Sequence, residues 1–161
     1  MKRKTEKSYI FEGLGFPIHL TNVPMIEVRG EYILDIDFNK LQKSVLLHLC
    51  HKKTPLTGDE VRFIRKYFSL TTTAFADLFG HTHSAVLKWE NQDSDIARMN
   101  PSTEICLRLE ILRFLHQEPS DFKDLFDQVT IPLLAQYSKA KQACEHIPFS
   151  INAKKELMSA A

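Results

Sequence analysis

Residues 57–91 hold a dense series of helix boundary signals, and these signals constrain the fold more than any other part of the chain. Thr57-Gly-Asp-Glu60 is a capping box, in which the threonine hydroxyl and the Glu60 carboxylate each accept a backbone N–H. Thr71 and Thr82 stand where two further helices would begin, and Gly80 stands where a helix end needs a left-handed residue. With the apolar residues that follow, the sequence predicts four helices over residues 57–116.

The second and third of these helices are short and meet at a sharp turn that contains a glycine, which is typical of a helix-turn-helix. Small or apolar residues stand where such helices cross, and we assign structural roles to Ala76, Gly80, Val86 and Trp89. On the third helix, the residues between these core positions point away from the core. They are the predicted contacts to DNA bases: His83, Ser84, Leu87 and Lys88. The predicted phosphate contacts are Thr72, Thr73 and Asn91.

The stretch from Leu70 to Asn91 resembles the Cro/cI-type (XRE-like) regulator pattern at Ala76, Gly80, Thr82, Val86, Trp89, Glu90 and Asn91, with Gln92 in place of the usual glycine. Over roughly residues 9–115 the chain is similar to MqsA-type antitoxins, which join an N-terminal zinc ribbon to this DNA-binding domain. The ribbon cysteines are missing, and Val28-Arg-Gly-Glu31 stands where the second pair is expected. The resemblance implies a lambda-repressor-like helix-turn-helix bundle.

The charge balance limits how this chain would bind nucleic acid. Its 161 residues have a net charge of +1, and residues 57–91 are themselves nearly neutral. Phosphate neutralisation dominates DNA affinity, so Lys52, Lys53, Arg98 and the basic start would have to contribute. The start itself, with Lys2-Arg3-Lys4 and Lys7, is either a solvated tail or an arm that follows the DNA backbone.

Metal and enzyme chemistry find no support in the sequence. The cysteines Cys50, Cys106 and Cys144 are far apart and form no CxxC pair, and His48 and Cys50 would lie on different faces of a helix. We find no catalytic motif, such as a Ser/His/Asp order, a carboxylate pair or a phosphate loop. We therefore predict no catalytic residues, no bound metal and no cofactor. With no run long enough to span a membrane, we expect a cytoplasmic protein with no membrane contact.

The chain divides, on this interpretation, into four parts. Residues 1–8 form a flexible basic tail, and residues 9–53 form a small α/β region with short antiparallel strands and a helix at 38–50. Residues 54–116 form the DNA-binding domain, and residues 117–161 form a C-terminal extension with helices at 119–128 and 132–145. The expected fold is therefore mainly α with a small N-terminal β element.

The predicted function is that of a sequence-specific regulator, a repressor of transcription, which binds double-stranded DNA as a homodimer on a palindromic operator. The alternative is an antitoxin whose segment 9–50 binds a toxin protein while the second half represses the operon. The last predicted helix of the DNA-binding domain is apolar on several sides, at Ile105, Leu107, Leu109, Ile111, Leu112 and Phe114. This stripe fits a dimer contact and packing within the chain about equally.

Overall fold

The computed structural model describes residues 2–115, 123–125, 127 and 149–158. The chain divides into two compact units, Met1–Val45 with Ile147–Ala161, and Leu46–His146. The division falls inside helix α1 (Phe38–His51), which supplies residues to both. The predicted helix at 132–145 lies outside the described residues, as does most of the one at 119–128.

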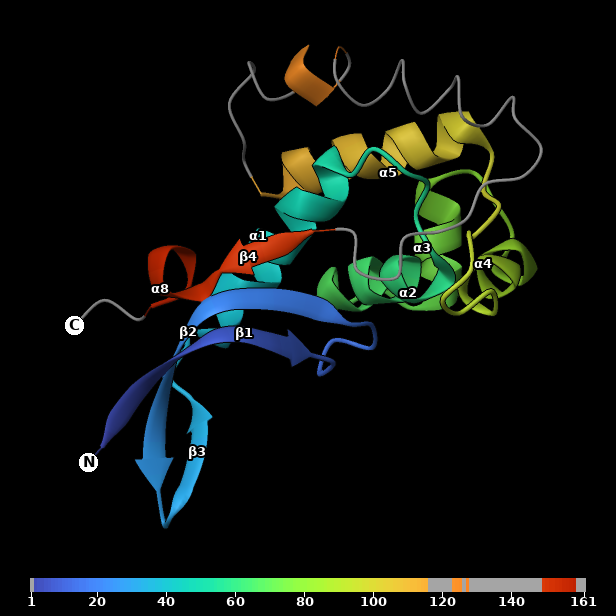
Figure 1. The fold of residues 1–161 in the computed structure, drawn as a ribbon. Helices are drawn as coiled ribbons and strands as arrows, with labels where there is room; N and C mark the ends of the chain where they lie inside the picture. Colours follow the sequence, from blue (N-terminus) through green and yellow to red (C-terminus); the bar gives the residue numbers. More distant parts are fainter. Residues whose placement is uncertain (1, 116–122, 126, 128–148, 159–161) are drawn as a thin grey trace. The chain divides into compact units, whose positions relative to one another are not determined.

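The first unit is built on a four-stranded mixed sheet. Strand β2 (Ile18–Val28) lies at its centre and pairs antiparallel with both β1 (Arg3–Phe11) and β3 (Glu31–Leu34). The short β4 (Ser150–Asn152) pairs parallel with β2 at His19–Thr21, so residues far apart in the chain meet in one sheet (Figure 1). Helix α8 (Ala153–Glu156) follows directly, and Leu157 accepts a hydrogen bond from the Asp37 N–H just before α1.

The protein is therefore α/β, and the prediction of a mainly α, lambda-repressor-like bundle with a small β element is wrong. The basic start, expected to be loose, is strand β1, paired from Arg3 with Ile26 to Phe11 with Ile18. The segment after Pro148, which shows no pattern in the sequence, supplies β4. Neither strand has the alternation of apolar and polar residues that marks a half-buried strand, because β1 is an exposed edge and β4 is only three residues long.

Residues with a left-handed backbone conformation shape the sheet at two places, one within β2 and one in the turn between β2 and β3. Asn22 has φ +52° within β2, and the buried positions shift there from Ile18 and Leu20 to Val23 and Met25. Asparagine tolerates this conformation better than most residues. Arg29 and Gly30 both have positive φ, at +54° and +88°, as a two-residue type I′ hairpin turn requires. The turn predicted at Gly30 is thus confirmed, and it joins β2 to β3.

Helix α1 begins at Phe38 as predicted and ends at His51, one residue beyond the predicted end. The Asp37 carboxylate accepts the N–H groups of Asn39 and Lys40 at 2.9 and 3.2 Å and so caps the helix start. Leu41, Val45 and Leu49, spaced four residues apart, are all fully buried. This spacing places them on one helical face, which is the face that the core covers.

The second unit contains the four helices predicted between residues 57 and 116: α2 (Gly58–Tyr67), α3 (Thr72–Leu78), α4 (His83–Glu90) and α5 (Pro101–Phe114). The capping box at Thr57 and Glu60 is present, and the Thr71 and Thr82 hydroxyls cap α3 and α4. Gly80 has φ +67°, as expected for the residue that ends α3. In the described part of the chain, no helix is long and apolar enough to cross a membrane.

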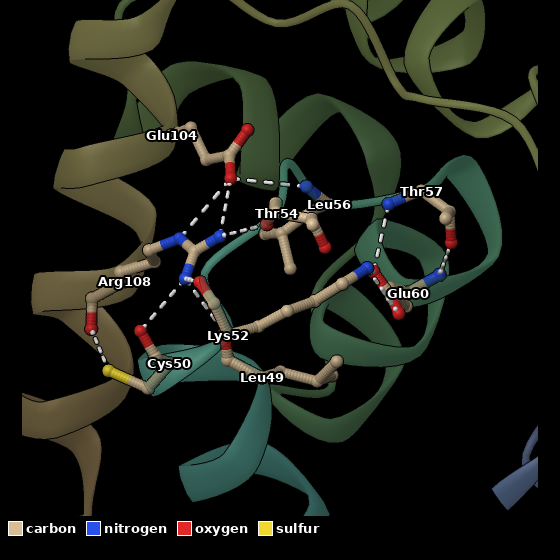
Figure 2. Close-up of polar contacts among 9 residues, drawn as sticks. All are labelled: Leu49, Cys50, Lys52, Thr54, Leu56, Thr57, Glu60, Glu104 and Arg108. Atoms are coloured by element: carbon tan, nitrogen blue, oxygen red, sulfur yellow. Dashed lines mark hydrogen bonds and ion pairs between the residues drawn. The ribbon is translucent and has the colours of Figure 1, made fainter. Parts of the chain in front are cut away.

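Arg108 on α5 is fully buried and closes the C-terminal end of α1, as Figure 2 shows. Its guanidinium nitrogens lie 2.6–3.1 Å from four backbone carbonyl oxygens, those of Leu49, Cys50, Lys52 and Thr54. The last carbonyls of a helix have no partner within it, and a cation there is also favoured by the helix dipole. Glu104, one turn earlier on α5, balances the charge with an oxygen 2.7 Å from Arg108 Nη2.

A second buried ion pair continues this network. Lys52 Nζ lies 2.8 Å from Glu60 Oε2, and both side chains are only 2% exposed. The same Glu60 oxygen accepts the Thr57 N–H at 2.9 Å, and Glu104 accepts the Leu56 N–H at 3.1 Å (Figure 2). The connection between α1 and α2 is therefore fixed by carboxylates from α2 on one side and α5 on the other.

Replacing Arg108 with methionine should destabilise the protein by about 3–5 kcal/mol, because Glu104 and four carbonyl groups would lose their buried partner. Arg113→Met is the matched control. Arg113 lies on the same helix and pairs with Glu110, but its side chain is 69% exposed, so solvent screens the pair and its loss should cost far less stability than the loss of Arg108. Urea unfolding measures both values, and equal losses for the two variants would contradict the role given to Arg108.

Candidate nucleic-acid interface

Helices α3 and α4 form a tightly joined pair. Gly80 N–H donates to Asp77 O at 3.2 Å and His81 N–H donates to Ala76 O at 2.9 Å, so the turn is hydrogen-bonded to the last turn of α3. The Phe75 and Phe79 rings pack edge to face with centroids 5.1 Å apart. Ala76, Val86 and Trp89 are buried, as the sequence predicts for residues that hold such a pair together.

The opposite face of α4 is open to solvent. The four side chains predicted to contact bases are all exposed there: His83, Ser84, Leu87 and Lys88. Leu87 is 37% exposed. The structure therefore brings these four residues together on one surface, with Lys88 supplying a positive charge.

The residues predicted to contact phosphate border this surface. Thr73 is exposed at the start of α3, and Asn91, also exposed, forms the C-cap of α4. Thr72 is half-buried because its hydroxyl lies 2.7 Å from His83 Nδ1. This contact links the first turn of α3 to the first turn of α4, and the sequence gives no sign of it.

The arginines of α2 are engaged in ion pairs, which residue counting cannot show. Arg65 holds Glu90 with two hydrogen bonds, at 2.5 and 2.9 Å, and these bonds raise the pKa of its guanidinium. Arg62 lies 2.7 Å from Asp59 and also donates to the Glu90 backbone carbonyl. Burial raises the pKa of the Asp59 carboxyl, and the nearby Arg62 charge acts in the opposite direction. Both arginines of α2 thus serve to fasten the end of α4.

The start of α2 rests directly on the loop that follows α4. The N–H groups of Gly58 and Asp59 donate to the carbonyls of Asp95 and Asp93 at 3.1 and 2.8 Å. With the capping box, these bonds satisfy the four N–H groups at the helix start that lack partners within the helix. The approach is so close that a Cβ on Gly58 would lie 2.6 Å from Trp89 O and 2.7 Å from Asp93 N.

Gly58→Ala should therefore destabilise the protein by about 1–3 kcal/mol, since the added methyl group would push α2 away from backbone atoms that cannot yield easily. By intrinsic helix preference alone, replacing a helical glycine with alanine would stabilise the protein. A loss of stability would therefore show that the steric clash outweighs this preference. Thermal or urea unfolding gives the measurement, and a stabilised Gly58→Ala protein would show that the close approach is absent.

Trp89 is a structural residue. It is 7% exposed, and the His81 ring packs against it edge to face with centroids 5.0 Å apart. His81 is held in turn by Thr103 on α5, whose hydroxyl lies 2.8 Å from its Nε2. The tryptophan thus joins α4, the turn before it and α5.

Trp89→Ala should cost about 3–5 kcal/mol of stability, the usual effect of removing a large buried aromatic side chain. Any change in ligand preference should follow only from this loss of structure. The experiment compares urea unfolding with DNA-binding preference at a temperature where the variant is folded. A fully stable Trp89→Ala protein with altered preference would mean that the indole reads the ligand directly.

The apolar residues of α5 divide between two environments. Leu107, Ile111 and Leu112 are fully buried within the second unit. Phe114 is 42% exposed, although its ring packs on Phe68 with centroids 4.6 Å apart. Packing within the chain therefore accounts for the buried part of the stripe.

Comparisons with protein-family models, with curated proteins and with solved structures each find no match to this chain. Over the described residues, no group of three or more histidine, cysteine, aspartate or glutamate side chains is arranged to hold a metal ion. A function must therefore be inferred from the geometry of the α3–α4 surface and its chemistry.

Proposed function

We propose that this chain is a sequence-specific DNA-binding transcriptional regulator that represses transcription and inserts α4 into the major groove of double-stranded DNA. The observation that carries the proposal is the division of α4 into two faces. One face is anchored by Val86 and Trp89, and the other presents four exposed side chains capable of contacting bases. A short rigid helix with its first turns exposed is the geometry that reads base edges in this mode of docking.

Each exposed side chain of α4 suits a particular feature of the groove. Ser84 donates to or accepts from either kind of base, and Lys88 donates to guanine O6 and N7 or to a phosphate. Leu87 offers an apolar contact for the methyl group of thymine. His83 stands at the first turn of the helix, where its free Nε2 side is turned away from Thr72.

Phosphate contacts come from Thr72, Thr73 and Asn91 in this proposal. Hydroxyl and amide groups bond phosphate oxygens and fix the register of a protein on DNA, but they release no counterions as cations do. Because Arg62 and Arg65 are held in ion pairs, few cations remain near the surface. The affinity should therefore depend only weakly on salt, and sequence-specific contacts should carry an unusually large share of it.

A homodimer follows from the size of the surface. One helix of eight residues covers only a few base pairs, and two copies related by a two-fold axis would read two half-sites of a palindrome. The half-sites would lie about 34 Å apart, which is one turn of B-DNA.

Ser84→Ala and Lys88→Ala should each weaken binding to an operator selected from a random library by about 1–3 kcal/mol and relax the preference at one position per half-site. Ser102→Ala is the matched control, because Ser102 is an exposed helical serine on α5 and is not one of the predicted DNA contacts. Thr73→Val should instead weaken selected and scrambled DNA alike, since it removes a phosphate contact; Thr73 is chosen because the Thr72 hydroxyl also holds His83, a proposed base contact.

These affinities should be measured at one fixed salt concentration, so that any contribution from phosphate neutralisation is the same for every variant. Wild-type affinity and preference in both the Ser84 and Lys88 variants would place the recognition surface elsewhere. A wild-type protein that binds all DNA sequences equally would refute the regulator proposal itself.

A further inference from the structure

Among the described residues, the outer edge of β3 carries no further strand. The antiparallel ladder to β2 uses alternate residues, and the Asp35 N–H donates to the Pro24 carbonyl at 2.9 Å. By this alternation Ile33 and Glu31 bond to β2, whereas the N–H and C=O groups of Tyr32 and Leu34 point outward. No strand within the described ranges pairs with β3 on that side. An edge of this kind is a template for strand addition.

An apolar concavity adjoins the same edge. It has a volume of about 430 Å³ and is lined by Tyr9, Met25, Tyr32, Ile33, Leu34 and Phe38. Ile33 and Phe38 are each 48% exposed and Tyr32 is 38% exposed, so large apolar side chains gather here in contact with water. The Lys4 ammonium lies 4.5 Å above the Tyr32 ring at the rim. Such a surface favours a partner that brings apolar side chains of its own.

The other face of β3 has a distinct charge pattern. Glu31, Ile33 and Asp35 alternate along the chain with Tyr32 and Leu34, so they share the opposite face of β3, and Ile33 also borders the concavity. Glu31 is exposed, and Asp35 is 35% exposed, with Arg3 3.8 Å away. A strand laid beside β3 would therefore meet a carboxylate at each end and an isoleucine between them.

We propose that the β3 edge binds an extended segment of a partner protein, added as an antiparallel strand with the pattern basic, apolar, any, apolar, basic. The two apolar residues stand opposite Tyr32 and Leu34, exchange backbone hydrogen bonds with them and fill the concavity. The central residue stands opposite Ile33. The two basic residues stand opposite Glu31 and Asp35, where pairs of opposite charge across a sheet are stabilising.

A second copy of this chain does not fit the same edge. No five-residue segment among the 161 residues has the required pattern. Pairing of two β3 strands with Ile33 opposite its counterpart would also place Glu31 opposite Asp35 of the other copy at both ends. Like charges directly opposite in a sheet are destabilising, so the pattern of charges selects a foreign, basic strand.

The test uses the full-length protein and a fluorescein-labelled peptide whose central five residues are Lys-Phe-Thr-Phe-Lys, measured by fluorescence anisotropy. We expect saturable binding that N-methylation of either phenylalanine amide abolishes, because these amides face Tyr32 and Leu34. N-methylation of the threonine amide, which points away from β3, should leave binding intact. These arms change only the peptide, so they do not depend on whether a protein variant folds.

A charge exchange supplies the second arm. Glu31→Lys should lower the affinity for the peptide about three- to ten-fold. A peptide with glutamate in place of the lysine that faces residue 31 should recover the lost affinity. Leu34→Ala should weaken binding, whereas Ile10→Ala should not, since Ile10 is an exposed apolar residue outside the concavity. Equal binding of a scrambled peptide, indifference to the phenylalanine N-methyl groups, or an edge already occupied by a second copy in solution would each overturn the proposal.

Discussion

The buried guanidinium of Arg108 is the interaction on which the second unit depends. The guanidinium donates hydrogen bonds to backbone carbonyls at the end of α1 and to the Thr54 carbonyl in the connection to α2. Glu104 beside it accepts the Leu56 N–H in the same connection. A buried arginine is costly to desolvate unless every donor has a partner. Here Nη1 and Nη2 donate five hydrogen bonds to carbonyl and carboxylate oxygens, and Nε donates a sixth to Glu104. Burial of this guanidinium is therefore compatible with stability. The start of α2 is placed by this arrangement, since Lys52 also pairs with Glu60 in its capping box.

From α2 the same logic extends to the proposed recognition helix. Arg65 binds Glu90, Gly58 allows α2 to touch the chain after α4, and Trp89 fills the space between. These contacts bury one face of α4 and leave its other face exposed and rigid. The arrangement uses the two arginines of α2 for structure, so the surface that we propose as the DNA contact is polar and only weakly basic. A protein of this kind gains specificity from hydrogen bonds at base edges more than from attraction to phosphate.

Local signals predicted the helices well because each boundary is determined by neighbouring residues. Thr57, Thr71 and Thr82 cap helices whose first turns lie within three residues of them, and Gly80 ends α3 through its own left-handed conformation. The same locality explains the exposed face of α4, since helical spacing alone separates Ser84 and Lys88 from Val86 and Trp89. The sheet lacked such signals. Strand β1 is exposed and basic, and its pairing with β2 is made by backbone atoms that every residue possesses.

The sequence by itself determined where α1 to α4 begin, several of the residues they bury, and which side chains of α4 face outward, because these properties follow from helical periodicity and caps within a few residues. Only the tertiary structure decided that the fold is α/β, that residues 150–152 return to pair with β2, and that Arg62, Arg65 and Arg108 are occupied by partners 3 to 59 positions away in the chain. Strand pairing and buried ion pairs join residues whose separation in sequence has no fixed value. No local pattern encodes them, and they form only when the whole chain brings both partners into one low-dielectric interior.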